Sequence, residues 1–230
     1  MSSGGIVVLS GAGLSAESGL GTFRDAEGLW SRYDLAEVAT PEGFAADPAK
    51  VLAFYDARRA NMAAAGPNAA HRALARLSRR AGVTLVTQNV DDLLERAGAA
   101  GVVHMHGELA RALCDTCGHR WGAAPVIAPD DRCPACNAAA CRPDVVWFGE
   151  MPYRMDEIEA ALAQADLFVS IGTSGEVYPA AGFVAAARAN GARTLELNLQ
   201  ASGARFDDVR EGPATELVPA WVDEVLDPSA

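Results

Sequence analysis

Short apolar runs and longer segments of helical periodicity alternate along most of this chain. The apolar runs are compact and bounded by glycine or polar residues, as expected of buried parallel strands, and lie at residues 6–10, 83–88, 102–107, 167–173 and 194–199. Segments of helical spacing lie between and after them, at residues 51–65, 67–80, 91–98, 155–165, 180–191 and 220–226. The alternation predicts an α/β protein with a mostly parallel sheet that helices cover on both faces.

Composition and charge narrow the possible partners. The chain has 230 residues, half of them apolar, which suits one substantial core with a small satellite module. Its 19 basic and 30 acidic residues give a net charge of −11, which argues against a surface that binds nucleic acid. Apolar runs stay far below the roughly 20 residues that span a bilayer, and no secretory leader precedes the first strand. We therefore expect a cytoplasmic protein with no membrane or nucleic-acid partner.

Four of the five cysteines form two C-x-x-C pairs separated by 15 residues: Cys114, Cys117, Cys133 and Cys136. Paired knuckles of this spacing predict a tetrahedral thiolate site for one zinc ion, inserted into the α/β pattern. Four thiolates leave no open coordination position, so the metal is expected to be structural. Disulfides are the alternative, and a reducing cytosol disfavours them. We leave Cys141 and His119 outside the ligand set.

The first predicted strand ends in a glycine-rich loop. Residues 11–16, GAGLSA, match the G-x-G-x-x-G/A fingerprint, in which glycines let the backbone approach a pyrophosphate at a helix start. An ordinary tight turn is the alternative, because the motif alone is a weak signal. A dehydrogenase would carry an acidic residue after a second strand about 20 residues on, and TFRDAEGLW stands there instead. Hydride transfer is therefore not predicted.

Polar groups follow three further predicted strands, at residues 87–91, 104–107 and 172–174. Carboxyl ends of parallel strands meet at one edge of the sheet, so these groups are expected to line one crevice. Each has a structural alternative: Asn89 or Asp91 could cap the next helix, Ser174 could fill a turn, and His106 could be a core histidine. The convergence of the three segments favours a functional site.

Taken together, several motifs resemble the sirtuins, a family of NAD-dependent protein-lysine deacylases. The resemblance runs from residue 6 to about residue 225 and rests on GAGLSAESGLGTFR, TQNVDD, HMHGEL, the double knuckle, RPDVVWFGE, IGTSGEVYPAAGF and ELNLQ. It implies one catalytic unit over residues 1–230, with NAD in the cleft between a Rossmann-like domain and a smaller module. The implied boundaries are 1–31, 67–108 and 143–230 for the Rossmann-like NAD-binding domain, 32–66 for a helical insert and 109–142 for the zinc-binding insert.

The resemblance also implies a reaction and the residues that perform it. In sirtuins the acyl carbonyl oxygen attacks the ribose carbon that carries nicotinamide, and a histidine then acts as general base; the motif match makes this His106. Asn89 and Asp91 match residues that orient the nicotinamide. Further matched cofactor contacts are Gly11, Ala12, Gly13, Ser15, Ala16, Phe23, Arg24, Gln88, Val90, Gly172, Thr173, Ser174, Asn198, Leu199, Gln200 and Ala214.

Two segments resemble the parts of sirtuins that hold the acylated substrate. Residues 146–150 resemble the strand that pairs with the substrate backbone, which makes Val146, Phe148, Gly149 and Glu150 candidate contacts. Tyr55 and Arg58 lie on one helical face and resemble the Y-x-x-R feature of bacterial class III sirtuins, which remove succinyl and malonyl groups. The alternative is a solvent-facing arginine above a core tyrosine.

The expected activity is therefore removal of acetyl, succinyl and malonyl groups from lysine, with nicotinamide and O-acyl-ADP-ribose as products. Mono-ADP-ribosyl transfer to protein and a non-catalytic NAD-sensing adaptor are the alternatives. Two positions depart from the sirtuin pattern: Leu94 stands where histidine is common, and Gln200 where an acidic residue is frequent. Neither departure removes a proposed catalytic group.

Overall fold

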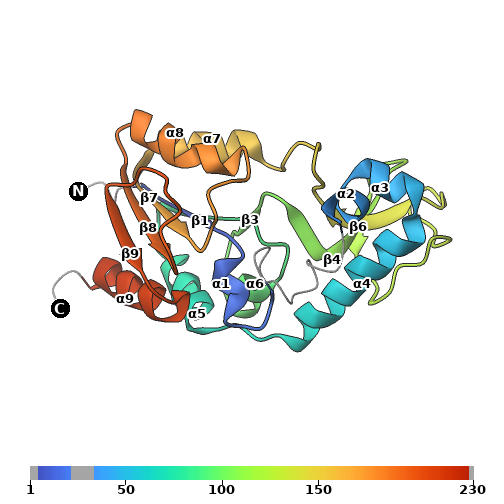
Figure 1. Cartoon of the computed structure of the whole chain (residues 1–230), viewed down its shortest axis with the longest axis horizontal. Coiled ribbons are helices and arrows are strands. Elements are labelled where there is room, and N and C mark those ends of the chain that lie inside the picture. Colours follow the sequence, from blue (N-terminus) through green and yellow to red (C-terminus); the bar gives the residue numbers. More distant parts are fainter. Residues whose placement is uncertain (1–4, 22–33, 228–230) are drawn as a thin grey trace.

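The computed structural model describes residues 5–21 and 34–227 and has two lobes (Figure 1). The larger lobe is built on a six-stranded parallel sheet with the order β3-β2-β1-β7-β8-β9. Its strands are β1 (Gly5–Ser10), β2 (Val83–Thr87), β3 (Val103–His104), β7 (Ala165–Ile171), β8 (Arg193–Asn198) and β9 (Asp208–Glu211). The chain returns from the β3 edge to place β7 beside β1, which is the Rossmann-like arrangement. The predicted fold class is confirmed.

Alternating residues of the strands build two hydrophobic layers, one on each face of this sheet. Ile6 and Val8 pack in the layer beneath α5 (Ala69–Leu77) and α9 (Ala214–Leu226). Val7 and Leu9 pack in the layer beneath α7 (Met155–Ala163) and α8 (Phe183–Ala189). A strand that is buried on both faces reads as a continuous apolar run, which is why β1 was recognisable in the sequence. Figure 1 shows the two helix pairs on opposite sides of the sheet.

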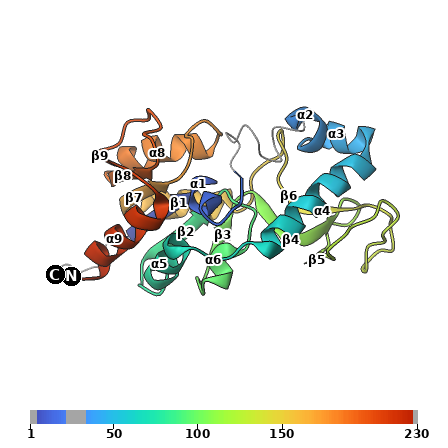
Figure 2. The ribbon, with the colours of Figure 1, turned by 60° about the horizontal axis from the view of Figure 1, so that its bottom comes forward.

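The smaller lobe combines an antiparallel sheet with three helices (Figure 2). The sheet has the order β5-β4-β6. Its elements are β4 (Gly107–Cys114), β5 (Arg120–Gly122) and β6 (Cys141–Val145), with α2 (Leu35–Val38), α3 (Pro41–Ala46) and α4 (Pro48–Ala64) beside them. The sheet thus begins before and ends after the zinc-binding insert predicted at 109–142.

Polar contacts fasten α4 to the zinc-binding insert. Arg59, 6% exposed, donates from Nη1 to the Leu109 carbonyl at 2.8 Å and from Nη2 to Asp56 Oδ1 at 2.7 Å. The Asp56 carboxylate in turn accepts the backbone N–H of Ile127 at 3.2 Å. A buried guanidinium requires such partners, so α4 and the insert are held as one body.

The structure corrects the sequence-based prediction at several elements, three of which belong to the parallel sheet or pack on it. The final helix was predicted at 220–226 but begins at Ala214, because Pro219 lies inside it and had weakened the helical pattern. Strand β9 was missed, since it is a short, polar edge strand without alternation. The strand predicted at 102–107 is only β3: a turn follows it, and Gly107 adopts φ +79° to start β4.

The turn between β3 and β4 determines where His106 lies. A Cβ at residue 107 would approach the Asp144 carbonyl oxygen to 2.1 Å, so only glycine can occupy this position. His106 consequently lies in the turn between the two lobes rather than at the end of a strand.

Among residues 5–21 and 34–227, no helix combines the length and apolar character needed to cross a bilayer.

Candidate active site

The glycine-rich loop after β1 packs directly on the end of β7. Gly11 donates its N–H to the Ile171 carbonyl at 2.9 Å, and Gly13 donates to the Gly172 carbonyl at 2.8 Å. A Cβ at Gly13 would lie 2.7 Å from Gly172 Cα, and one at Gly172 would lie 2.7 Å from the Gly13 carbonyl carbon. The two glycines are therefore required by their mutual approach, which is the close packing of turn and strand that the fingerprint needs.

Side chains from three other strand ends join this loop. Gln88, after β2, donates from Nε2 to Thr173 Oγ1 at 3.1 Å, and Thr173 follows β7. Asn198, the last residue of β8, donates from Nδ2 to the Thr173 carbonyl at 2.9 Å. The predicted convergence of polar groups at the carboxyl edge of the sheet is thus present in the fold.

A hydrogen-bonded cluster centred on Ser15 lies at the same edge. Because the Asn68 N–H donates to His71 Nδ1 at 3.2 Å, neutral His71 carries its proton on Nε2 and donates to Ser15 Oγ at 3.3 Å. Ser15 donates to Asp91 Oδ2 at 2.9 Å and accepts from Asn89 Nδ2 at 3.2 Å. His71 therefore orients Ser15, which orients both predicted nicotinamide-site residues.

Sequence reasoning assigned His71 only to a helix. The available signal was the pair formed by Asn68 and His71, which have the spacing of a capping box and do form one. Asp91 precedes Asp92, the N-cap residue of α6 (Leu93–Arg96), and its Oδ1 accepts the N–H of Leu93 at 3.1 Å, so it also satisfies one amide at the start of that helix. Burial is the largest influence on Asp91 and raises the pKa of its carboxyl.

The buried His71 predicts a specific loss of stability in acid. Burial is the largest cause that lowers the pKa of His71 to about 4, whereas an unfolded chain protonates histidine near pH ~6.5. Between these values only the unfolded state binds the proton, so stability present above pH ~6.5 is lost as pH falls toward 4, by up to about 1.4 kcal/mol per pH unit. Free energies of unfolding measured across this window should fall more steeply for the wild type than for His71→Gln. Parallel curves would contradict this.

His106 meets the electrostatic requirements of a general base. Its Nδ1 lies 3.1 Å from the Gln88 carbonyl oxygen, which can only accept, so Nδ1 holds the proton and Nε2 keeps its lone pair. Burial lowers the pKa of His106, and the hydrogen bond to Gln88 opposes this only in part. The imidazole is therefore neutral at pH 7, with an unprotonated Nε2.

His104, two residues earlier, has a pKa shifted in the opposite direction. Its Nδ1 faces the Asn89 carbonyl at 3.3 Å, and its Nε2 faces Glu95 Oε1 at 2.8 Å. Burial, the largest single cause, lowers the pKa of His104, but Glu95, Glu108 and the Asn89 carbonyl together outweigh it and the net pKa is raised. Both ring nitrogens have acceptors, which suits an imidazolium held in place. His104 is thus held by partners at both ring nitrogens, whereas for His106 only Nδ1 has a partner among the described residues.

The remaining predicted cofactor residues occupy varied positions. Ala12 and Ala16 bracket α1 (Gly13–Ala16), and Ala214 starts α9, whose Thr215 donates to Glu17 at 2.6 Å. Phe23 and Arg24 lie outside the described residues.

Four further predicted cofactor residues either make local hydrogen bonds or are exposed to solvent. Ser174 Oγ accepts the Glu176 N–H at 3.3 Å, which is the turn alternative, and the Val90 carbonyl accepts the Leu109 N–H at 2.8 Å. Leu199 is 71% exposed, and Gln200 is exposed beside it, just beyond β8. These positions place Leu199 and Gln200 at the outer rim of the strand-end edge.

Tyr55 and Arg58 share one face of α4, and the Asp91 carboxylate lies near enough to Arg58 to act on its charge. The Arg58 guanidinium carbon lies 5.4 Å from the Tyr55 ring centroid and 5.7 Å from that of Phe54. Burial lowers the pKa of Arg58, while Tyr55 and Asp91 act in the opposite direction. The tyrosine is a core residue, 2% exposed, as the alternative required, but the arginine is partly buried rather than solvent-facing.

The substrate loop, residues 146–150, follows β6 and is not a strand, contrary to prediction. Its amides already have partners: Val146 donates to the His106 carbonyl and Phe148 to the Ala39 carbonyl, each at 2.9 Å. The Glu150 carboxylate points inward and accepts the Trp147 N–H at 2.8 Å. Phe148 is 48% exposed, so the loop presents an apolar side chain to solvent.

The four knuckle cysteines converge as a metal site requires. Their sulfur atoms all lie within 4.8 Å of one another, and the Cys114–Cys136 and Cys117–Cys133 Sγ pairs are each 3.7 Å apart. Tetrahedral Zn²⁺ with Zn–S bonds of about 2.3 Å places sulfurs about 3.8 Å apart, so the residues fit this ion. Cys141 is buried nearby and does not belong to the group of four.

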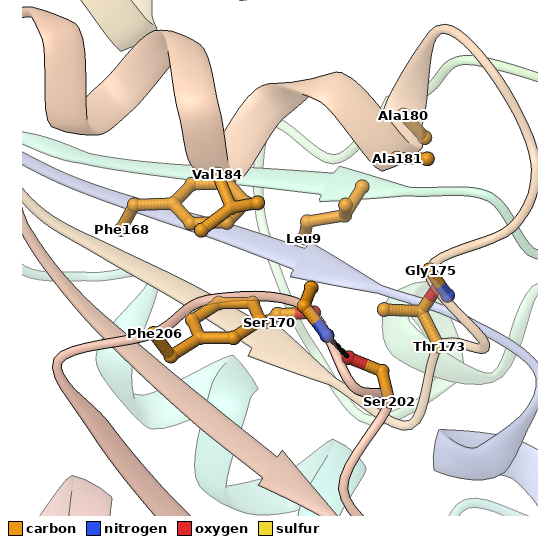
Figure 3. Close-up of a pocket in the computed structure, with 11 residues that line it drawn as sticks. Leu9, Phe168, Ser170, Thr173, Gly175, Ala180, Ala181, Val184, Ser202 and Phe206 are labelled. Carbon is orange, nitrogen blue, oxygen red and sulfur yellow. Dashed lines mark hydrogen bonds between the residues drawn. The ribbon is translucent and has the colours of Figure 1, made fainter.

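Two hollows accompany the site without forming it. A cavity of ≈ 10 Å³, close to the size of one water molecule, lies beside Thr173 between Leu9, Phe168 and the Ser202 loop (Figure 3). A hollow of ≈ 390 Å³ lies where the lobes join and is lined by charged side chains that include Arg111, Arg120 and Asp144. Residues 11–16 of the glycine-rich loop line neither of these two hollows.

The sheet order and the glycine-rich first turn place this chain among dinucleotide-binding α/β proteins. The Sir2 family model matches residues 11–179, and the chain belongs to that family. It is 60% identical to an NAD-dependent protein deacylase of Caulobacter vibrioides, with 96% of each chain covered. It is 52% identical to a protein of the same name in Escherichia coli strain K12, covering 96% of this chain and 82% of the relative.

A solved structure has the same fold. A Sir2 homologue in complex with NAD superposes with a TM-score of 0.90 at 39% identity, over 98% of this chain and 90% of the homologue. The family that the sequence motifs indicated is thus confirmed.

Proposed function

We propose that this chain is an NAD-dependent protein-lysine deacylase that removes acetyl and acidic acyl groups, namely succinyl and malonyl. The observation that carries this proposal is His106, whose unprotonated Nε2 lies in the turn between the lobes, beside the strand-end edge. A base of lowered pKa at this place suits proton abstraction near pH 7. The relatives named NAD-dependent protein deacylase support the same reaction.

We assign each site residue a role in the reaction from its position in the fold. Gly11 and Gly13 would admit the cofactor phosphates to the loop backbone, and Asn89 and Asp91 would orient the nicotinamide end. NAD, when bound, supplies the ADP-ribose that accepts the acyl group, with nicotinamide as the other product. Arg58 and Tyr55 would contact the acyl group, because they are neighbours on one face of α4 and Arg58 lies near Asp91.

The acidic-acyl specificity rests on Arg58. A guanidinium can bind a carboxylate through two parallel hydrogen bonds, and its partial burial strengthens that attraction relative to water. Tyr55 Oη accepts the indole N–H of Trp147 at 2.9 Å, so the phenol proton remains able to donate to a second carboxylate oxygen. An acetyl group has no carboxylate and would use neither contact.

Replacing Arg58 should therefore change acyl preference. For Arg58→Met we expect kcat/KM on a succinyl-lysine peptide to fall roughly tenfold to a hundredfold, the range for losing charged hydrogen bonds, with little change on the matched acetyl peptide. Mass spectrometry of both peptides, incubated with and without NAD, measures the two rates. Lys50→Met removes a cation from the same helix near its exposed start and serves as the control.

The outcomes separate the competing functions. Equal losses on both peptides would contradict the carboxylate contact. Turnover without NAD would contradict the reaction itself. Label from NAD that stays on protein without deacylation would favour ADP-ribosyl transfer, and binding of NAD without nicotinamide release would favour an adaptor.

A further inference from the structure

Arg142 is a buried cation that the chemistry above does not use. It lies in β6, its side chain is 6% exposed, and its guanidinium carbon is 4.1 Å from the ring centroid of Trp147. A charge at this depth must be matched by opposite charges or hydrogen bonds, or folding would be opposed by its desolvation. Its partners therefore show what it holds together.

The partners of Arg142 come from two separate segments. Its Nε donates to Asp115 Oδ1 at 2.7 Å, within the first knuckle (residues 114–117). Its Nη2 and Nη1 donate to the two oxygens of Glu150, at 2.7 and 3.3 Å. Glu150 also accepts the Trp147 N–H, so the bidentate pair fixes the fold of the substrate loop.

The sheet register places Arg142 between these segments. In the β4–β6 pairing, Leu113 lies opposite Arg142 and Cys114 lies opposite Cys141. Asp115 follows Cys114 directly, so it is a near neighbour of Arg142, while the other end of β6 continues into the substrate loop. The cross-strand pairing thus ties the position of the loop to that of the knuckle.

Contacts of Trp147 extend from the substrate loop to Tyr55, a residue of the proposed acyl site. Trp147, stacked on Arg142, donates its indole N–H to Tyr55, and its ring centroid lies 5.1 Å from that of Phe44. Arg142 therefore has no direct contact with the proposed acyl site, but it holds the side chain that holds Tyr55.

We propose that Arg142 is a positioning residue that fastens the substrate loop to the first knuckle and so sets the geometry in which acyl-lysine binds. This inference rests on the proposed function. It also makes a statement about the loop that holds without any reaction, because the Arg142–Glu150 pair orders residues 146–150 in the free protein.

The test uses the full chain and three variants, Arg142→Met, Arg142→Lys and Glu150→Gln. For Arg142→Met we expect KM for the acyl peptide to rise by roughly tenfold, as for loss of a charged hydrogen-bond pair, with KM for NAD unchanged. Arg142→Lys should show a smaller rise in KM for the acyl peptide, because lysine keeps the positive charge but lacks the planar guanidinium that binds both oxygens of Glu150. Arg111→Met, which removes a cation from neighbouring β4 paired only at 3.9 Å, is the control.

Hydrogen exchange followed by mass spectrometry supplies a readout that does not depend on activity. Residues 146–150 should exchange faster in Arg142→Met and Glu150→Gln, while residues 165–171 in β7 should keep their protection. Unchanged exchange at 146–150 would overturn the inference, as would equal rises in KM for NAD and peptide. If the wild type lacked deacylase activity, the proposed function would fail while the exchange result still decided the role of Arg142.

Discussion

Replacing His106 with alanine should lower kcat/KM for deacylation by about 10² to 10⁴, the contribution typical of a positioned general base. The loss follows because Nε2 is the only ring nitrogen with a free lone pair once Nδ1 donates to the Gln88 carbonyl. The lowered pKa of His106 adds a second expectation for the wild type. Since the base works only when neutral, the acid limb of the kcat/KM profile should have its midpoint below pH ~6.5.

A matched variant controls for the loss of a histidine. His119→Ala removes an imidazole that is exposed and stacks on Trp121 in the smaller lobe, so its activity and pH profile should match the wild type. Steady-state rates on one acyl peptide between pH 5 and 9, with NAD saturating, give both quantities. An acid limb centred above pH ~7, or full activity in His106→Ala, would contradict the assignment.

Replacing one knuckle cysteine should remove zinc and unfold much of the smaller lobe. In Cys133→Ser three thiolates remain, and a structural site of this kind contributes binding free energy directly to folding, so destabilisation of at least several kcal/mol is expected. Cys133 is also buried in the cluster formed by Leu52, Ala112 and Ile127, so the damage should spread into α4. Zinc content and thermal unfolding measure the effect.

Cys141 provides the control for this experiment. It is buried beside the site but outside the four converging sulfurs, so Cys141→Ser should retain one zinc ion per chain and lose only the packing of a thiol. Zinc retained in Cys133→Ser with an unchanged melting temperature would contradict the four-thiolate site. Zinc lost from Cys141→Ser would show that the ligand set was chosen wrongly.

Much of the fold was predictable because its signals are local. Strand β1 is buried on both faces, so its uninterrupted apolar run predicted a buried strand. The spacing of the cysteines predicted the two knuckles. The incorrect predictions, at β9 and at the turn before β4, also have physical reasons. Strand β9 pairs along one edge only and needs no apolar pattern, and the turn at Gly107 is set by contact with Asp144, far along the chain.

In the candidate site, too, motifs predicted which residues take part but not how those residues contact one another. Motifs indicated Ser15, Asn89 and Asp91, but not that one hydroxyl joins them or that His71 fixes its direction. The substrate loop was expected to be a strand because residues 146–150 resemble the segment of sirtuins that pairs with the substrate backbone. Its amides instead pair with Ala39, His106 and its own glutamate, contacts that no local pattern records.

The sequence by itself determined the α/β class, the family and the ligands for zinc, since these depend on residue types at fixed spacing along the chain. Only the tertiary structure decided the opposite pKa shifts of His104 and His106 and the partners of Arg142. Those properties arise from burial and from charges that the fold brings together across the chain, such as Glu95 beside His104 and Glu150 beside Arg142.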